Sequence, residues 1–170
     1  MILVGIGSNL AAPGYGSPQD TVEAAVAALP TVGVAVVGRS PWYLSEPVPA
    51  SDQPWFVNGI VVATTELPPP VLLARLLDLE ERFGRERGAR DAARTLDLDL
   101  LDYDGRQCST ATLELPHPRL HERRFVLVPL CDIAPEWRHP RRGLTAAELL
   151  GQLPPGQPIR RFTDSKAGPA

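Results

Sequence analysis

The chain has 170 residues, of which 44% are hydrophobic and 22% charged, the length and composition of one folded domain with a buried core. Its net charge of −3 argues against a nucleic acid as the main partner. No apolar run is long enough to span a membrane, and no charged leader or Cys-x-x-Cys pair is found, so we expect a cytoplasmic protein without a membrane partner.

Three strands and one helix are predicted up to residue 65. The strands cover residues 2–6, 32–37 and 56–65, because each is a short apolar or β-branched run. The helix begins at Pro18 with Ser17 as its N-cap, and Pro30 ends it. Between the second and third strands, the proline-rich residues 45–54 predict a loop.

The strongest helical pattern follows three prolines at positions 68–70. Leu72, Leu76, Leu79 and Phe83 recur at helical spacing, and Gly84 is the expected end of the helix. Residues 84–94 are polar and arginine-rich and have no apolar period, which predicts a mobile loop. Residues 96–103 predict a fourth strand.

Shorter elements follow a turn at Asp104 and Gly105. Residues 113–115 and 125–130 predict strands, and residues 116–122 predict a loop or a single turn. Residues 144–150 predict a short helix with Thr145 as its N-cap. The proline- and glycine-rich tail after about residue 155 is expected to be poorly ordered.

The order of these elements is strand, helix, strand, strand, helix, strand, followed by an extension. This βαββαβ order is typical of the ferredoxin-like fold. We therefore predict an α+β protein with one mainly antiparallel sheet, helices packed on it, and a C-terminal extension of a strand and a helix. Because no linker or repeat divides the chain, residues 1–170 are expected to form a single domain.

Asp97 and Asp99 are the sharpest candidates for chemistry. Alternate side chains of a strand share a face, so the neighbouring leucines would face the core and the two carboxylates would share the other face, roughly 6–7 Å apart. Two carboxylates this close repel each other unless a cation lies between them, and oxygen ligands suit Mg²⁺, which also binds phosphate oxygens. The alternative is a half-exposed strand with a polar outer face.

Five arginines precede the carboxylate pair, at positions 82, 85, 87, 90 and 94. A guanidinium binds phosphate oxygens bidentately, so a basic loop beside two carboxylates would suit a metal-bound polyphosphate. The alternative is a solvated charged surface in which nearby acids pair with the arginines. That alternative is favoured for Arg82 and Arg87, and less so for Arg85 and Arg94.

A second basic group contains His117, Arg119 and Arg123. The histidine stands between two prolines, which restricts it and suits a positioned phosphate donor, although a lone histidine is more often structural. The segment Gly5-Ile6-Gly7 lacks the Gly-Lys-Ser/Thr of a phosphate loop. It indicates close backbone packing at the end of a strand.

Four stretches of the chain together carry a specific resemblance. They are Gly5-Ile6-Gly7-Ser8-Asn9-Leu10; residues 43–58 with Glu46-Pro47-Val48 and Asp52-Gln53-Pro54; residues 84–99 ending in Thr95-Leu96-Asp97-Leu98-Asp99; and residues 115–135 with Leu115-Pro116-His117-Pro118 and Ile133-Ala134-Pro135. In their order and spacing they resemble the 6-hydroxymethyl-7,8-dihydropterin pyrophosphokinases. The resemblance implies an enzyme of folate biosynthesis that transfers pyrophosphate from ATP to the pterin alcohol and releases AMP. We expect a monomer whose partners are these small molecules.

The resemblance also implies roles for particular residues. Asp97 and Asp99 would hold two Mg²⁺ ions on the ATP phosphates, and Arg85 and Arg94 would be catalytic arginines of a closing loop. The residues implied to bind ATP are Arg85, Arg94, Leu100, His117 and Arg123. The residues implied to bind the pterin are Asn58, the backbone around Ser45, Glu46 and Val48, and two stacking rings, Phe56 and Phe125.

One departure from the family pattern concerns the loop before the carboxylates. The family usually has Trp-Gly-Pro-Arg where this chain has Asp91-Ala92-Ala93-Arg94, so how the loop closes is an open point. Two other functions remain open from the residues alone. One is a Mg²⁺-dependent nucleotidyltransferase, which attacks the α-phosphorus and releases pyrophosphate. The other is a ferredoxin-like RNA-binding module, against which the net charge and the acidic pair argue.

Overall fold

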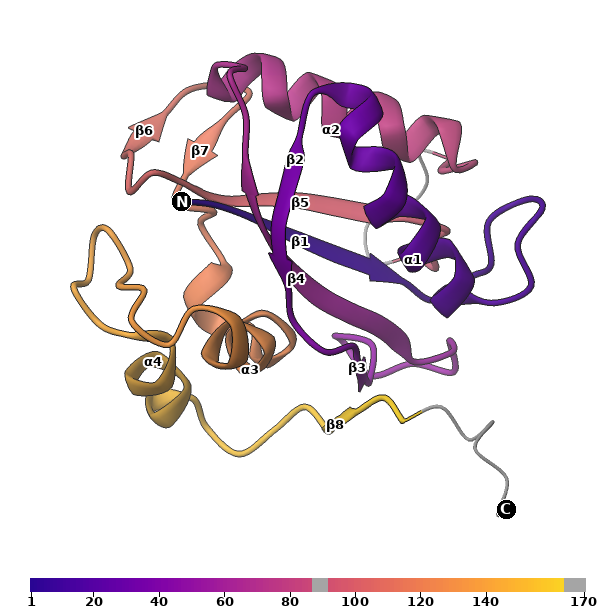
Figure 1. Cartoon of the computed structure of the whole chain (residues 1–170). Coiled ribbons are helices and arrows are strands. Elements are labelled where there is room, and N and C mark those ends of the chain that lie inside the picture. The colour runs from indigo at the N-terminus through magenta and orange to yellow at the C-terminus, as the bar shows by residue number, and fades with distance from the viewer. Residues whose placement is uncertain (87–91, 164–170) are drawn as a thin grey trace, which may run out of the picture.

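The computed structural model describes residues 1–86 and 92–163, and its centre is a six-stranded antiparallel sheet (Figure 1). The strands are β1 (Ile2–Ser8), β2 (Ala35–Arg39), β3 (Tyr43–Ser45), β4 (Phe56–Thr64), β5 (Asp97–Tyr103) and β8 (Ile159–Arg161). They are ordered β5-β1-β4-β3-β8, and β2 pairs with the C-terminal part of β4. The predicted α+β class, with a mainly antiparallel sheet, is confirmed.

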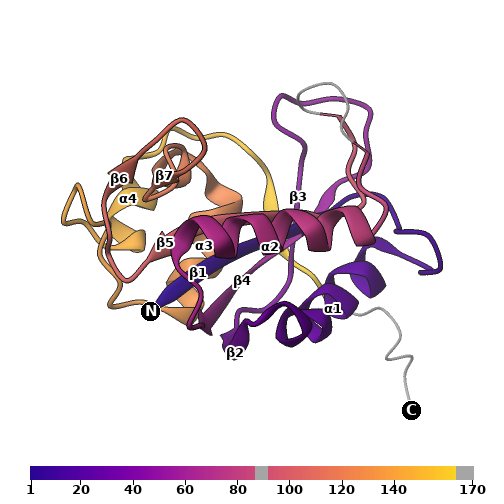
Figure 2. The same ribbon diagram turned by 90° about the horizontal axis from the view of Figure 1, so that it is seen from above.

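Helices cover both faces of the sheet (Figures 1 and 2). On one face lie α1 (Pro18–Ala28) and α2 (Pro69–Arg82), and on the other lies α3 (Arg124–Ile133), with α4 (Ala146–Gln152) packed against it. The sheet separates two apolar cores. Leu72, Leu76 and Leu79 of α2 are fully buried in one, and Leu127 of α3 is fully buried in the other.

Four short elements complete the described structure. The strands β6 (Cys108–Ser109) and β7 (Glu114–Leu115) form a small hairpin after β5, and 3₁₀ turns cover Leu29–Val32 and Leu120–Glu122. Within the described ranges, no helix is both long enough and apolar enough to cross a membrane.

The helix ends follow local chemistry, which is why the sequence predicts them well. The Ser17 hydroxyl accepts a hydrogen bond from the Asp20 amide at 3.1 Å and caps α1. Gly84 ends α2 with a φ of +74°, a conformation that glycine adopts without strain. Thr145 and Glu148 form a capping box at the start of α4.

The predicted strand over residues 125–130 is wrong, because these residues belong to α3. A short apolar run with β-branched residues fits a strand or a buried helix equally well by composition. Val126, Leu130 and Ala134 recur four residues apart and are all buried, which is helical spacing. Pro129 lies inside this helix and is itself buried.

Other boundaries also differ from the predictions. The second strand begins at Ala35 rather than at residue 32, because a 3₁₀ turn continues past Pro30 and ends at Gly33, whose φ is +85°. The tail was expected to be poorly ordered, yet residues 159–161 form β8 on the edge of β3. Strands β3 and β6 were not predicted. Residues 87–91 of the predicted mobile loop and residues 164–170 of the tail lie outside the described residues.

Candidate active site

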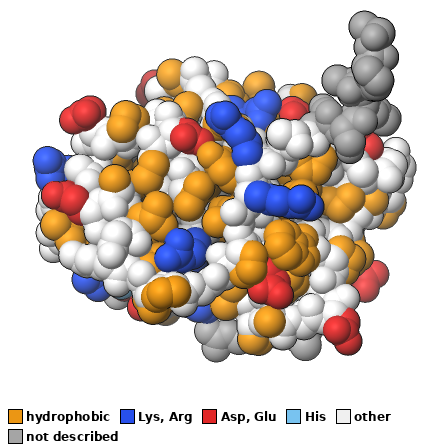
Figure 3. Space-filling model, turned by 90° about the horizontal axis from the view of Figure 1, so that it is seen from below, with side chains coloured by type: hydrophobic (Ala, Val, Ile, Leu, Met, Phe, Trp, Pro, Cys, Tyr) orange, Lys and Arg blue, Asp and Glu red, His pale blue; other side chains and the backbone are white. Residues whose placement is uncertain are grey.

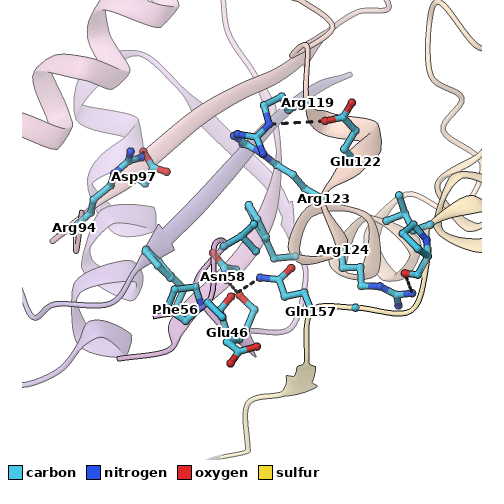
Figure 4. A pocket seen from close by; sticks show the side chains of 18 of the residues that line it. Glu46, Phe56, Asn58, Arg94, Asp97, Arg119, Glu122, Arg123, Arg124 and Gln157 are labelled. Carbon is cyan, nitrogen blue, oxygen red and sulfur yellow. Dashed lines mark hydrogen bonds and ion pairs between the residues drawn. The ribbon is translucent and has the colours of Figure 1, made fainter. Parts of the chain in front are cut away.

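A pocket of about 420 Å³ opens on the face of the sheet that carries α3. Its walls come from β4 and the loop after β3, from the start of α3, and from residues 153–157 after α4. On this side of the molecule, arginine side chains lie among apolar ones (Figure 3). The pocket therefore combines apolar and charged side chains; we call the part with Asp97 and Arg94 its charged end, and the part with Phe56 and Asn58 its apolar end (Figure 4).

The pairing of β1 with β4 and β5 places residues from both ends of the pocket on one face of the sheet. Gly7 pairs with Asn58 of β4 on one side and with Asp97 of β5 on the other, and Gly5 pairs with Asp99. Residues directly opposite each other in a sheet share a face, so Asn58 and both aspartates project from the same face. A Cβ on Gly7 would lie 2.7 Å from Oδ1 of Asn58, which explains why this position needs glycine. The predicted close packing at the end of this strand is confirmed.

The apolar end of the pocket contains the predicted pterin-binding residues. Asn58 is only 6% exposed, and its Nδ2 donates a hydrogen bond to the Ser45 hydroxyl at 2.6 Å. This bond fixes the orientation of the amide. Phe56 of β4 and Phe125, on the first turn of α3, both line the pocket, as do Glu46 and Val48. All six residues assigned to the pterin therefore line one pocket.

At the charged end, Asp97 and Asp99 are paired with arginines. Arg85 and Arg94 each donate to Oδ1 of Asp97 at 2.9 Å, and Arg123 donates to Oδ2 of Asp99 at 3.0 Å. Burial raises the pKa of Asp97, the charge on Asp99 raises it further, and the guanidinium groups of Arg94 and Arg85 oppose the rise. The arginines that sequence analysis assigned to phosphate thus hold the carboxylates here.

Glu80 is a third acid in this group and was not predicted as a site residue. It lies on α2, is 3% exposed, pairs with Arg85, and accepts a hydrogen bond from the Leu98 amide at 2.6 Å. Burial raises its pKa to about 7, against the opposing effects of the Leu98 amide and the Arg85 charge. The signal in the sequence was its position on the helix face toward Leu76 and Leu79, where an acid is unusual.

The buried Asn9 connects the loop that carries Arg94 to the loop before β4. Its Oδ1 accepts from the Arg94 amide at 2.8 Å, and its Nδ2 donates to Gln53 and to the Pro54 carbonyl. The Asn9 amide in turn donates to the Arg94 carbonyl at 3.1 Å. The turn after β1 therefore positions Arg94 beside Asp97.

His117 lies near Asp97 and Arg123, and it is uncharged near neutral pH. Burial and, to a smaller extent, the Arg123 charge lower its pKa to about 4. Its Nδ1 accepts a hydrogen bond from the Arg119 amide at 3.1 Å, so in the neutral ring the proton is on Nε2. The side chain can therefore donate one hydrogen bond without carrying a positive charge.

Only some of the residues predicted to bind ATP or metal line the pocket. Asp97, Arg94 and Arg123 line the pocket, whereas Arg85, Asp99 and His117 do not. Arg85 and Asp99 are joined to the lining residues by the ion pairs described above. The side chain of Leu100 is 4% exposed in the core on the opposite face of the sheet. The alternation of β5 therefore turns it away from Asp97 and Asp99, and only its backbone could contact ATP.

Several residues that line the pocket were not predicted as site residues, among them Arg119, Glu122, Arg124 and residues 153–157. Arg119 already belonged to the basic group around His117, and Arg124 directly follows Arg123 of that group, so both could have been assigned to the site. Residues 153–157 carry no local signal, because their position depends on β8 pairing with the distant β3.

The site combines a group of paired carboxylates and arginines with a pocket lined by two phenylalanine rings and a buried amide, and the comparisons with known proteins identify a transferase. The chain belongs to the 7,8-dihydro-6-hydroxymethylpterin-pyrophosphokinase family, whose model matches residues 3–135. It is similar to the 2-amino-4-hydroxy-6-hydroxymethyldihydropteridine pyrophosphokinase of Synechocystis sp., with 43% identity over 89% of this chain and 75% of that protein. The proteins of the same name from Methylorubrum extorquens and Pseudomonas aeruginosa are 41% and 40% identical, over 89% and 90% of this chain and 92% and 91% of their own lengths.

Proposed function

We propose that this protein transfers pyrophosphate from ATP to 6-hydroxymethyl-7,8-dihydropterin, with Mg²⁺, and releases AMP in folate biosynthesis. The observation that supports this most is the pocket itself. One end presents the fixed Asn58 amide and two phenylalanine rings, and the other presents Asp97 with Arg94 and Arg123. A flat heterocycle held at the first end would direct its hydroxymethyl group toward the second.

Magnesium suits the donor set of this site. Asp97 and Asp99 offer hard carboxylate oxygens on one strand face, and each is now balanced by a guanidinium. Mg²⁺ commonly takes one or two protein carboxylates and completes its coordination with water and phosphate oxygens. When bound with ATP, the metal would neutralise charge on the phosphates.

The arginines would change partners when the nucleotide binds. Arg85, Arg94 and Arg123 would release the carboxylates and bind phosphate oxygens bidentately. His117 would donate from Nε2 to a phosphate oxygen. The pterin hydroxyl oxygen then attacks the β-phosphorus and loses its proton, and the bond from the β-phosphorus to the bridging oxygen breaks, so that AMP leaves with that oxygen. Such a reaction depends on alignment and charge stabilisation rather than on a protein nucleophile.

The test is to incubate the protein with ATP, Mg²⁺ and the reduced hydroxymethylpterin and to identify the nucleotide product. AMP together with a pyrophosphorylated pterin is expected. Release of pyrophosphate with a nucleotide attached to the pterin would instead indicate a nucleotidyltransferase. Absence of any pterin-dependent product, or of a requirement for Mg²⁺, would contradict the proposal.

A further inference from the structure

The segment that follows α4, residues 153–157, forms one wall of the pocket; we call it the C-terminal strap. Both of its ends are fixed to the domain. Near its start, the guanidinium of Arg124 donates to the Pro154 carbonyl at 3.1 Å. After its end, β8 pairs with β3 and aligns Ile159 with Ser45, and the Glu46 amide donates to the Pro158 carbonyl at 3.1 Å.

Every residue of the strap lines the pocket, beside Ser45, Glu46 and Asn58. Gln157 points into this end, and its Nε2 donates a hydrogen bond to the Glu46 carbonyl at 2.5 Å (Figure 4). Together with the bond from the Glu46 amide to the Pro158 carbonyl, this contact fixes both backbone polar groups of Glu46. The strap also lies beyond residues 3–135, the part of the chain that the family model matches.

We propose that the C-terminal strap forms part of the binding site for the flat heterocycle and that Gln157 is a positioning residue, which fixes the backbone of residues 45–48 through the Glu46 carbonyl. The proposal rests on the function proposed above. A loop that hydrogen-bonds a ring edge through its backbone binds well only when that backbone is fixed beforehand. Gln157 lies on a different side of the pocket from Asp97 and Arg94 (Figure 4), so the strap should affect the heterocycle and not the nucleotide.

The experiment compares Gln157→Ala and Gln157→Glu with Gln152→Ala. Gln152 is an exposed residue at the end of α4 that does not line the pocket, so it is a matched control. Gln157→Glu keeps the size of the side chain but removes the donor and places a carboxylate against the Glu46 carbonyl. Calorimetric titration with 6-hydroxymethylpterin and, separately, with a non-hydrolysable ATP analogue gives both affinities, and steady-state kinetics gives KM and kcat.

Both Gln157 variants are expected to bind the pterin about 3- to 10-fold more weakly, the effect of one lost hydrogen bond. Affinity for the ATP analogue and kcat should stay as in the wild type, and Gln152→Ala should resemble the wild type throughout. Pterin affinities equal to that of Gln152→Ala would overturn the proposal. Equal losses for both ligands would also overturn it, because they would indicate a general effect on folding.

The outcomes separate this inference from the proposed function. A wild-type protein that binds the pterin but forms no AMP would refute the proposed reaction, while the comparison of pterin affinities would still decide the role of Gln157. A wild-type protein that binds no pterin would refute both.

Discussion

Replacement of Glu80 by glutamine should change how the stability of the protein depends on pH. Glu80 is 3% exposed, and burial raises its pKa from 4.5 to about 7. Between pH 4.5 and about pH 7, the Glu80 carboxyl keeps its proton in the native state, whereas in the unfolded chain it has lost it. This proton stabilises the native state, and the stabilisation is fully present below the unfolded pKa and is lost as pH rises through the folded pKa. Glutamine has no proton to lose, so Glu80→Gln removes this dependence.

The size of the effect follows from the two pKa values. Between about pH 5 and about pH 8, the wild-type protein should lose roughly 2.5 kcal/mol of unfolding free energy through this one group. Glu80→Gln keeps an oxygen that can accept from the Leu98 amide, so the interaction with β5 should survive. From about pH 5 to about pH 8, the unfolding free energy of Glu80→Gln minus that of the wild type should therefore rise by roughly 2.5 kcal/mol.

Urea unfolding of both proteins at the two pH values measures the difference. Glu81→Gln is a suitable control, because it removes one negative charge from an exposed position next to Glu80 on the same helix. If the free-energy difference between Glu80→Gln and the wild type is the same at both pH values, burial does not hold Glu80 protonated and the reasoning fails. A change in the opposite direction would mean that Arg85 dominates over burial and lowers the pKa of Glu80.

Three further predictions concern the site. Asp97→Asn and Asp99→Asn should each abolish turnover in the AMP assay while leaving the thermal unfolding midpoint near that of the wild type, because the lost ion pairs are offset by relief of the repulsion between the two carboxylates, and asparagine keeps an oxygen that can accept from the arginines; near-normal turnover of either would contradict the metal assignment. Gly7→Ala should weaken pterin binding far more than binding of an ATP analogue, because the new methyl group displaces the Asn58 amide. Equal losses in titrations of the two ligands would show that Asn58 supports the fold instead. Arg94→Ala should lower kcat by roughly two to three powers of ten, the scale for loss of one positioned charge donor, with a smaller effect on KM; stopped-flow single-turnover kinetics would detect it, and an unchanged chemical step would contradict it.

The elements that the sequence predicted correctly are those determined by neighbouring residues. Ser17, Gly84 and Thr145 mark helix ends through contacts with residues close in the chain. The alternation around Asp97 and Asp99 predicted their shared face because a strand repeats every two residues. The six residues assigned to the pterin line one pocket, although what they bind is still a prediction.

The elements that were missed depend on distant partners. The composition of residues 125–130 fits a strand or a helix equally well. They form a helix because they pack against one face of the sheet, where α3 buries Leu127 and Leu130. Strand β8 forms only because the edge of β3 is free to pair with it. The position of Gln157 follows from that pairing, so no local pattern could have predicted it. Likewise, the ion pairs of Asp97 and Asp99 join residues from three separate segments.

These ion pairs also affect the entropy of ligand binding. Each arginine side chain has rotamer entropy equivalent to about 2 kcal/mol, part of which is lost whenever a guanidinium is fixed in place. Because Asp97 and Asp99 already hold Arg85, Arg94 and Arg123, that loss occurs when the chain folds. A polyphosphate that takes over these guanidinium groups would meet side chains that are already ordered, and most of their rotamer entropy would not be lost a second time.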